Sequence, residues 1–178
     1  MPNWCENKLT ANGSKKDLNA LMKYVKGKTE DGAVLEFDFE KVIPTPKELL
    51  LNDSPISDKK LKEKFLKKYG TEDWYSWRLK NWDTKWNLAP EDEWLVGKKA
   101  VNISFHTAWS PPINIVRLLS KKFPKLSFLL TFCEPGMAFA GEYFVKGGEE
   151  HELCFQSGGQ EKEYNRIAEK FGLVEEVE

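Results

Sequence analysis

The chain has 178 residues, of which 40% are hydrophobic and 13% aromatic, and this composition supports a folded core and excludes a disordered chain. Its 27 Lys and Arg residues are balanced by 28 Asp and Glu residues, so the chain lacks the basic excess of a typical DNA-binding domain. No apolar run approaches the ~20 residues that span a bilayer, and the start, MPNWCENKLT, has no signal-peptide pattern. We therefore expect a cytoplasmic protein with no membrane partner.

The N-terminal part of the chain predicts a strand, a helix and a second strand. Residues 4–11 have the pattern of a strand, and the Asn-Gly pair at 12–13 turns the chain. Ser14 is a good helix N-cap, and apolar residues then recur at helical spacing as far as Gly27. Residues 33–42, AVLEFDFEKV, alternate between apolar and mainly acidic side chains and predict a half-buried strand.

Residues 47–98 differ in character and are interpreted as an inserted helical, tryptophan-rich subdomain. A lysine-rich amphipathic helix is predicted over 58–69. Four tryptophans follow within the short stretch EDWYSWRLKNWDTKWN. Tryptophan buries more apolar area than any other side chain and also carries one N–H donor. The cluster is therefore either a compact satellite core or a recognition surface.

Regular alternation returns in the C-terminal half. VNISFHTAW predicts a strand, and Ser110 with Pro111 predicts the cap and first position of a helix. LSFLLTF predicts an interior strand, and residues 134–137 suit a type II turn into the next strand. Residues 147–178 are expected to form an extension made of a hairpin and a last helix. This extension is acidic, with Glu149, Glu150, Glu152, Glu175, Glu176 and Glu178.

The order of the predicted elements indicates the fold. When residues 47–98 are set aside, the order is strand, helix, strand, strand, helix, strand, which is the ferredoxin-like split βαβ pattern. We therefore predict one α+β domain over residues 1–178. Its first and third strands are expected to lie parallel in the centre of the sheet, with the helices on one face.

Several sequence blocks also resemble a known family: PNWCENKLT, FEKVIPTP, NWDTKWN, FHTAWSPP and FPKLSFLLTFCEPGMAFAGEY. Their order is similar to that in the YubB-like ferredoxin-fold family, whose members are borne on phages and plasmids. The resemblance covers most of residues 2–144 and is weak in 47–73 and after 147. It implies a ferredoxin-like fold and a mobile-element origin. The family brings no established activity or catalytic residues, so function has to be argued from a site.

The chain offers few residues for metal or covalent chemistry. It has two histidines and three widely spaced cysteines, with no C-x-x-C or H-E-x-x-H motif, so we expect no metal and no cofactor. The odd number of cysteines suits a reducing compartment. Cys5 or Cys133 could pair with His106 as a nucleophile, but the predicted fold places His106 toward the opposite end of its strand. We interpret the cysteines as small buried hydrophobes.

Two surfaces of the predicted fold are candidates for binding single-stranded nucleic acid. The lysine helix, Lys59–Lys68, lies beside the tryptophans and could form a basic stacking surface, although a solvated lysine face over a packed helix is the favoured interpretation. The sheet face opposite the helices has no central aromatic pair and carries several carboxylates, so we reject base stacking there. This face is expected to present Glu36, Asp38, Glu40, Asn102, Ser104, His106, Ser127 and Thr131.

The predicted topology places one further site at the edge of the sheet. The start of the first strand, the loop after the second, the chain entering the third and the turn after the fourth should meet there. Aromatic rings, a proline, amides and one acid would then line a shallow pocket that suits a ligand or a peptide. The alternative is that the tryptophans plug the junction between insertion and sheet. The predicted site residues are Trp4, Pro44, Arg78, Trp82, Lys85, Trp86, Asn87 and Glu134.

These observations favour a non-enzymatic binding module with a protein partner. Tryptophan and arginine dominate interface energetics, so Arg78 and Lys85 are expected on the rim of the site. The rival hypotheses are a small enzyme that acts through Glu134 or a cysteine, and an accessory protein that binds nucleic acid through Lys59–Lys68. The expected anchors are Trp4, Trp82 and Trp86.

Overall fold

The computed structural model describes residues 3–173, and the remaining residues, including the acidic Glu175, Glu176 and Glu178, lie outside the described part. The strands are β1 (Trp4–Asn12), β2 (Gly27–Lys28), β3 (Val34–Leu35), β4 (Trp94–Val96), β5 (Ala100–Ala108), β6 (Ser127–Glu134), β7 (Phe139–Lys146) and β8 (Glu149–Gln156). The helices are α1 (Lys15–Val25), α2 (Phe39–Val42), α3 (Lys47–Leu50), α4 (Lys59–Tyr69), α5 (Trp74–Trp82), α6 (Ile113–Lys122) and α7 (Glu161–Ala168), followed by the 3-10 turn η1 (Glu169–Phe171).

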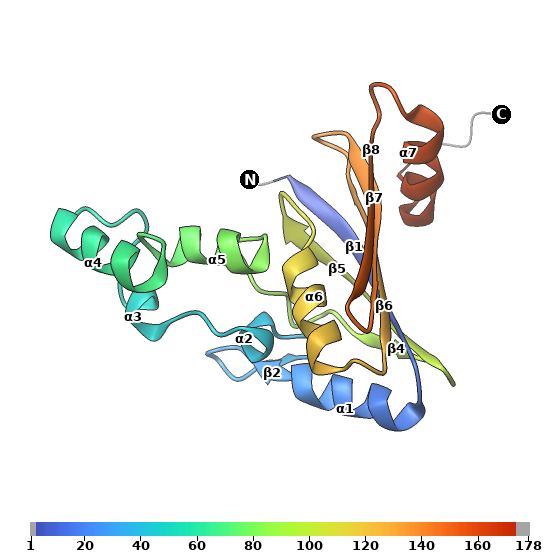
Figure 1. Ribbon diagram of the computed structural model, residues 1–178, viewed down its shortest axis with the longest axis horizontal. Coiled ribbons are helices and arrows are strands. Elements are labelled where there is room, and N and C mark those ends of the chain that lie inside the picture. The colour runs from blue at the N-terminus through green and yellow to red at the C-terminus, as the bar shows by residue number, and fades with distance from the viewer. Residues whose placement is uncertain (1–2, 174–178) are drawn as a thin grey trace.

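The main sheet has the strand order β4-β5-β1-β6-β7-β8, and all its neighbouring strands are antiparallel. β5 and β6 therefore run parallel to each other on either side of β1, and α6 connects them (Figure 1). This arrangement is a split βαβ unit. The predicted fold class, α+β with a ferredoxin-like sheet, is confirmed.

The prediction that the first and third strands run parallel is wrong. β1 and β5 are antiparallel neighbours, with Leu9 opposite Ile103. The reason lies in where β5 begins. The amide of Gly13 donates to the carbonyl of Lys99 at 3.1 Å, so the β4–β5 hairpin turns beside the end of β1 and β5 runs back along it. As a consequence, His106 lies at the end of the sheet where β1 begins, which is not the end that the sequence predicts.

The predicted strand over 33–42 is also wrong in most of its length. Only β3 is extended, in a separate two-stranded sheet with β2, and the carboxylate of Asp38 then caps the short helix α2. The alternation has a different cause, because Phe37 and Phe39 are buried against Phe105 in the layer that covers the sheet. β4 takes the edge position beside β5 instead.

Helices lie on both faces of the sheet, which corrects the predicted one-sided cover. α1, α2 and α6 lie over the face that forms the main core, and α7 packs on the other face against β6 and β7 (Figure 1). There Ile167 and Ala168 cover Cys133 and Ala140, which point away from the main core because their neighbour Phe132 points into it. No described helix covers this second face over β1 and β5, and we call that part the open face.

The start of α6 differs from the predicted cap. The helix begins at Ile113, although Ser110 and Pro111 have the pattern of a cap and first turn. Pro111 precedes Pro112, and a residue before proline is driven out of the helical region. The Ser110 hydroxyl donates instead to the backbone carbonyl of Asp83, which follows α5. The beginning of α6 is therefore tied to the segment after α5.

The turn between β6 and β7 does not have the predicted type II geometry. The left-handed residue is Ala138, with φ 56°, and not Gly136. Gly136 lies close to the start of β1 instead, because a Cβ atom at this position would lie 2.5 Å from Nδ2 of Asn3, whose side chain would have to move. The turn is thereby packed against the start of β1.

α3, α4 and α5 extend away from the sheet as a helical arm (Figure 1). Trp77 is buried within it, and Trp82 joins the arm to the main core, with its ring centroid 6.4 Å from Trp77 and 5.7 Å from Phe39. Two strands from the predicted insertion and extension belong to the main sheet, where β4 pairs with β5 and β8 with β7. None of the described helices is long and apolar enough to cross a membrane.

Candidate functional site

A hollow of about 610 Å³ lies on the open face, close to the start of β1 and the end of β5. Two tryptophan rings line it: Trp4 comes from β1, and Trp86 comes from the loop after α5. We call this hollow the aromatic pocket. Its lining consists of Trp4, Trp86, Asn87, Leu88, Ala89, Glu91, Asp92 and His106.

The alternation of side chains along two strands places Trp4 and His106 on the open face. Their neighbours Cys5 and Thr107 are buried on the opposite, core face. The rings of Trp4 and His106 are 6.5 Å apart and nearly perpendicular, at 78°. Nε2 of His106 lies 2.9 Å from a carboxylate oxygen of Glu6, its partner across the sheet. One wall of the pocket is thus fixed by the sheet itself.

The loop that carries Trp86 is fastened by hydrogen bonds on both sides of it. Thr84 is fully buried, and its hydroxyl donates to the carbonyl of Ala108 and accepts from the amide of Ala108, both at 3.1 Å. Asn87 accepts from the first amide of α2 at 2.9 Å and donates to Asp38 at 2.7 Å. Trp86 is therefore positioned by tertiary contacts between the sheet and α2.

The two tryptophans present partly exposed rings to solvent. Trp4 is 45% and Trp86 39% exposed, and their ring centroids lie 5.7 Å apart with a tilt of 42°. Exposed, rigidly held tryptophans of this kind are typical of binding hot spots. The ammonium of Lys85 lies 4.0 Å from the centroid of the Trp86 ring, so this ring already holds one cation through its π system.

The remaining wall of the pocket is acidic. Glu91 and Asp92 line it, and Glu6 stands beside His106. Burial raises the pKa of Asp92 above its usual range, while a hydrogen bond at Ala89 and the nearby His106 act in the opposite direction. The combination of two indole rings and several carboxylates is complementary to a positively charged group.

Besides Lys85, four predicted site residues do not line the pocket: Pro44, Arg78, Trp82 and Glu134. Trp82 is fully buried and donates from Nε1 to the carbonyl of Ile43 at 2.9 Å, so it plugs the junction and is not a surface anchor. The guanidinium of Arg78 lies 4.5 Å from the Trp82 ring and donates to Glu40 at 2.9 Å. Pro44 is exposed but does not line the pocket.

Glu134, the predicted acid of the site, is closed off by its own turn. It is only 1% exposed, and its two carboxylate oxygens accept from the amides of Gly136 at 2.9 Å and Met137 at 2.6 Å. These bonds stabilise the β6–β7 turn and leave the carboxylate with almost no solvent contact.

The cysteines and His106 do not form a nucleophilic pair. Burial raises the pKa of both Cys5 and Cys133, so both thiols stay protonated near neutral pH. Cys5 points to the core. Cys133 is on the same face of the sheet as His106, but β1 lies between the two residues. The Sγ atom of Cys133 is 3.8 Å from the hydroxyl of Tyr164, which belongs to α7. Residues 3–173 contain no cluster of His, Cys, Asp and Glu that could hold a metal ion.

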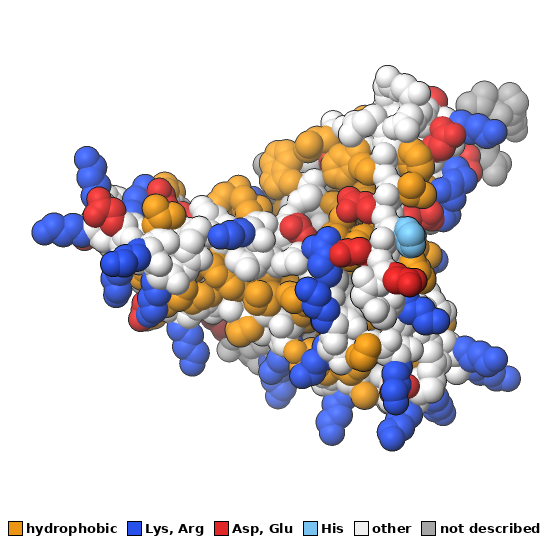
Figure 2. Space-filling view, viewed as in Figure 1, with side chains coloured by type: hydrophobic (Ala, Val, Ile, Leu, Met, Phe, Trp, Pro, Cys, Tyr) orange, Lys and Arg blue, Asp and Glu red, His pale blue; other side chains and the backbone are white. Residues whose placement is uncertain are grey.

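The lysine helix α4 lies in the arm, away from the aromatic pocket, and Figure 2 shows its end of the molecule ringed by basic side chains. Some of its lysines are already paired: Lys62 lies 3.2 Å from Glu72, and Lys68 lies 2.9 Å from Glu48. Trp77, one of the tryptophans predicted to stack beside this helix, is buried. The helix therefore contributes mainly charge to the surface.

The sequence prediction finds one wall of the aromatic pocket and misses the other. Trp4, Trp86 and Asn87 line the pocket, and Lys85 contacts it through Trp86. Part of the missed wall could have been predicted from the sequence, because its residues lie in the loop NLAPED, which directly follows the tryptophan segment. His106 reaches the pocket only because β5 runs antiparallel to β1, which brings this histidine to the end of the sheet where β1 begins. The missed residues are Leu88, Ala89, Glu91, Asp92 and His106.

The fold and the pocket define an α+β protein with a ferredoxin-like sheet and an exposed aromatic pocket. Residues 81–175 match the family model described as "Ferredoxin-like domain in Api92-like protein". The match covers more than half of the chain, and the chain belongs to the Api92-like family. Trp86, Glu91, Asp92 and His106 fall within the matched residues, whereas Trp4 does not.

The chain is also similar to a solved structure, the crystal structure of a protein Api92 from Yersinia pseudotuberculosis. The TM-score is 0.53 at 9% sequence identity, and the similarity covers 86% of this chain and 98% of that chain. At this identity the likeness shows a shared fold alone. The comparison with curated proteins gives no match.

Proposed function

We propose that this protein is a non-enzymatic binding module, and that the aromatic pocket holds a positively charged side chain of a protein partner. The observation that carries this proposal is the pair of exposed rings, Trp4 and Trp86, in a hollow whose other wall is acidic. Its volume of about 610 Å³ lies within the range of pockets that enclose small ligands. A lysine or arginine side chain would fit the same space.

The charge of the pocket favours a cation over a neutral apolar group. A cation over an indole ring gains about 0.5–2 kcal/mol, depending on how far it is desolvated. Glu91 and Asp92 would add Coulomb attraction. A neutral ligand would bury Asp92 further without a partner, which costs free energy. The position of Lys85 on Trp86 gives an internal example of the same contact.

We also infer an origin on a phage or plasmid and a role in the bacterial cytoplasm. Support comes from the sequence blocks that resemble the YubB-like family, such as FHTAWSPP and NWDTKWN. An enzymatic role receives less support, because Glu134 is enclosed and the pKa values of Cys5 and Cys133 are raised. Binding of nucleic acid through Lys59–Lys68 remains a second candidate, favoured by the projecting arm. Retention on heparin that falls steeply with salt would support it.

The proposal predicts that small cationic probes perturb the two tryptophans of the pocket. The probes are the N-acetyl methylamides of arginine and trimethyllysine, titrated into ¹⁵N-labelled protein while the indole N–H resonances are followed by NMR. We expect saturable shifts at Trp4 and Trp86, with dissociation constants on the order of millimolar, and no shift at the buried Trp82.

The controls separate charge from apolar contact. The citrulline and norleucine analogues should bind at least about tenfold more weakly, because they lack the charge. Trp86→Ala should abolish binding of the cationic probes. Trp109→Ala is the matched control, since Trp109 is 40% exposed but does not line the pocket. Equal binding of charged and neutral probes, or unchanged binding to Trp86→Ala, would contradict the proposal.

A further inference from the structure

Within residues 3–173, no further strand pairs with the outer edge of the sheet at β8. β8 has eight residues, stands last in the strand order, and exposes almost all of its side chains. An edge strand of this length presents a row of free N–H and C=O groups to which another strand can pair. The opposite edge, β4, has only three residues. β8 is therefore the longer of the two edges available to another chain.

The strand register shows which backbone groups of β8 face outward. Just beyond the strand, the amide of Ser157 donates to the carbonyl of Ala138 at 2.9 Å, so the odd-numbered residues of β8 exchange hydrogen bonds with β7. The even-numbered residues Glu150, Glu152 and Cys154 therefore direct their N–H and C=O groups to the free edge. Within the described residues, no backbone hydrogen bond from a segment other than β7 reaches these three.

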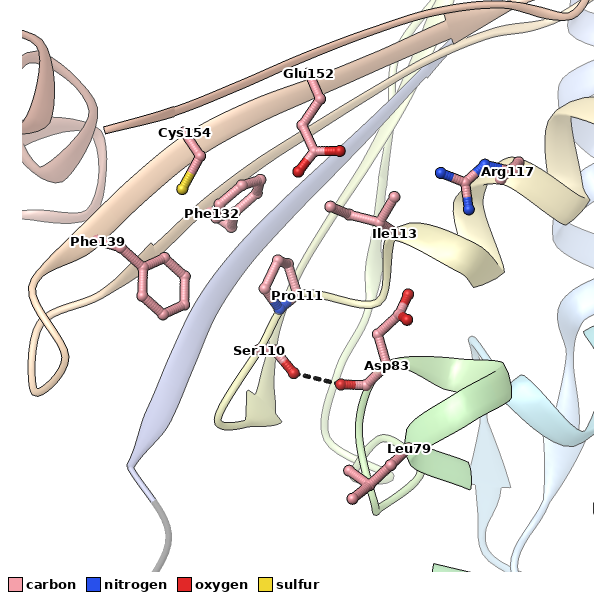
Figure 3. A pocket seen from close by; sticks show the side chains of 10 residues that line it. All are labelled: Leu79, Asp83, Ser110, Pro111, Ile113, Arg117, Phe132, Phe139, Glu152 and Cys154. Carbon is pink, nitrogen blue, oxygen red and sulfur yellow. Dashed lines mark hydrogen bonds between the residues drawn. The ribbon is translucent and has the colours of Figure 1, made fainter. Parts of the chain in front are cut away.

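A second hollow of about 610 Å³ lies behind this edge, between β7 and β8 on one side and the junction of α5 and α6 on the other (Figure 3). Its apolar part includes Phe132 and Phe139. The side chains of Glu152 and Cys154 also line it, so two of the three residues with outward backbone groups face the hollow. The lining consists of Leu79, Asp83, Ser110, Pro111, Ile113, Arg117, Phe132, Phe139, Glu152 and Cys154.

The edge and the hollow carry negative charge. β8 contains Glu149, Glu150 and Glu152 but no lysine or arginine, and Figure 2 shows acidic side chains gathered beside it. Glu150 is neutralised by Arg117, with an N–O distance of 2.9 Å. Glu152 has no such ion pair within residues 3–173, and Figure 3 shows its carboxylate entering the hollow that Asp83 borders from the other side.

Asp83 is held in place by contacts that leave room for a ligand. One carboxylate oxygen accepts from the amide of Asn114 at 2.6 Å, at the start of α6. Burial raises the pKa of Asp83, the charge of Glu152 adds to this, and Arg117 opposes it. A cation placed between the two carboxylates would relieve the repulsion between them.

We propose that the free edge of β8, with the hollow behind it, is a second binding site that accepts an extended, basic segment of a partner protein as an additional strand. The outward backbone groups of Glu150, Glu152 and Cys154 would pair with that segment, and a lysine or arginine side chain would enter the hollow between Glu152 and Asp83. Backbone pairing supplies affinity in this mode of recognition, and the pocket for alternate side chains supplies specificity.

Charge also argues against a second copy of this chain as the occupant. An antiparallel self-pairing centred on Glu152 places this residue opposite its own copy, and one of the two neighbouring registers pairs it with Glu150. Like charges directly opposite each other across a ladder are destabilising. A basic segment places opposite charges at these positions instead.

The test uses the full chain and two model peptides, acetyl-TKVKVKT-amide and its acidic counterpart acetyl-TEVEVET-amide. We expect saturable binding of the basic peptide by calorimetry and NMR. We also expect slower amide hydrogen exchange at Glu150, Glu152 and Cys154, because these N–H groups become bonded. The acidic peptide should bind at least about tenfold more weakly. Trp86→Ala should bind the basic peptide normally, which separates this site from the aromatic pocket.

Three variants separate backbone pairing from charge. Cys154→Pro removes an outward N–H without touching the ladder to β7, and it should weaken binding by about tenfold or more. Glu152→Gln should weaken it several-fold. Glu149→Gln is the matched control, because it removes the same charge from the same strand at an odd-numbered position, on the opposite face, and should have little effect.

The proposal is overturned if the basic peptide does not bind, if both peptides bind equally, or if a folded Cys154→Pro binds as the wild type does. Protection of other amides in place of the three outward amides, in the wild-type protein, would also overturn it. That measurement needs no variant, so it decides the matter even if Cys154→Pro fails to fold. A dimer through β8 in sedimentation experiments would show that a second copy is the occupant and would refute the basic segment.

Discussion

Trp82 and Trp86 stand close together in the chain, yet their side chains have different surroundings. Trp82 has no exposed surface, and the guanidinium of Arg78 covers its ring at 4.5 Å. Trp86 is 39% exposed and lies beside the ring of Trp4 in the lining of the aromatic pocket. The left-handed residue Asp83, with φ 65°, ends α5 between them and redirects the chain. A reversal of direction after α5 therefore separates a core residue from a surface residue.

This difference predicts the effect of alanine at each position on stability. Trp82→Ala should lower the free energy of unfolding by about 3–5 kcal/mol, because it opens a cavity and removes the hydrogen bond to the carbonyl of Ile43. Trp86→Ala should cost roughly 1 kcal/mol, because part of the ring is already in water. Urea unfolding followed by circular dichroism measures both values. Equal losses would mean that Trp86 belongs to the core and not to a binding surface.

At the scale of elements, loop contacts decide how the pocket is built. The segment from Thr84 to Asp92 has little regular structure, and the side chain of Asn87 fixes it to α2. The side-chain oxygen of Asn87 accepts from the first amide of α2, which has no backbone partner within the helix. The side-chain nitrogen of Asn87 donates to the carboxylate of Asp38, a residue that is 4% exposed. The side-chain amide of Asn87 therefore stabilises both the start of α2 and one wall of the aromatic pocket.

Asn87→Ala tests this link. The change leaves the first amide of α2 without a partner and removes one of the two hydrogen bonds to the Asp38 carboxylate, so we expect a loss of about 1–3 kcal/mol in unfolding free energy, together with weaker binding of the cationic probes. Asn81→Ala is the control, because its side chain makes one local bond to Trp77 within α5 and should cost under about 1 kcal/mol. Equal effects of the two changes would contradict the structural role of Asn87.

At the scale of the whole molecule, the sheet is assembled from distant parts of the chain. The family match begins at residue 81, but the central strand of the sheet is β1, which pairs with both β5 and β6. Cys5, Leu9 and Ala11 of β1 are fully buried. The matched region therefore lacks the strand that joins its two halves, and it also lacks Trp4 of the aromatic pocket.

A fragment that begins at residue 81 should consequently fail to fold alone. Without β1, two ladders are lost, and the apolar faces of β5 and β6 have no strand between them. We expect poorly dispersed amide resonances and no cooperative thermal transition. A synthetic peptide of residues 1–13 should restore both, in proportion to its concentration. Cooperative unfolding of the fragment without the peptide would contradict this role of β1.

Some elements of the fold follow directly from local sequence patterns. The alternation in VNISFHTAW predicts β5, and the lysine-rich apolar spacing predicts α4, because periodicity reports which side of an element is buried. Residues 33–42 show the limit of the same signal. Phe37 and Phe39 alternate because both are buried, yet they lie in the layer that covers the sheet and not in a strand of the main sheet. The aromatic pocket shows a similar limit, because among its lining residues only the tryptophans stand out in the composition of the sequence.

By itself, the sequence determined the class of fold, the approximate extent of long elements such as β1, α4 and β5, and the concentration of tryptophan near one end of the sheet. Only the tertiary structure decided the direction of β5 relative to β1, the side on which α7 packs, and which tryptophans remain in contact with water. The physical reason is that burial patterns are encoded locally, whereas strand pairing and solvent exposure depend on partners that are far away in the chain.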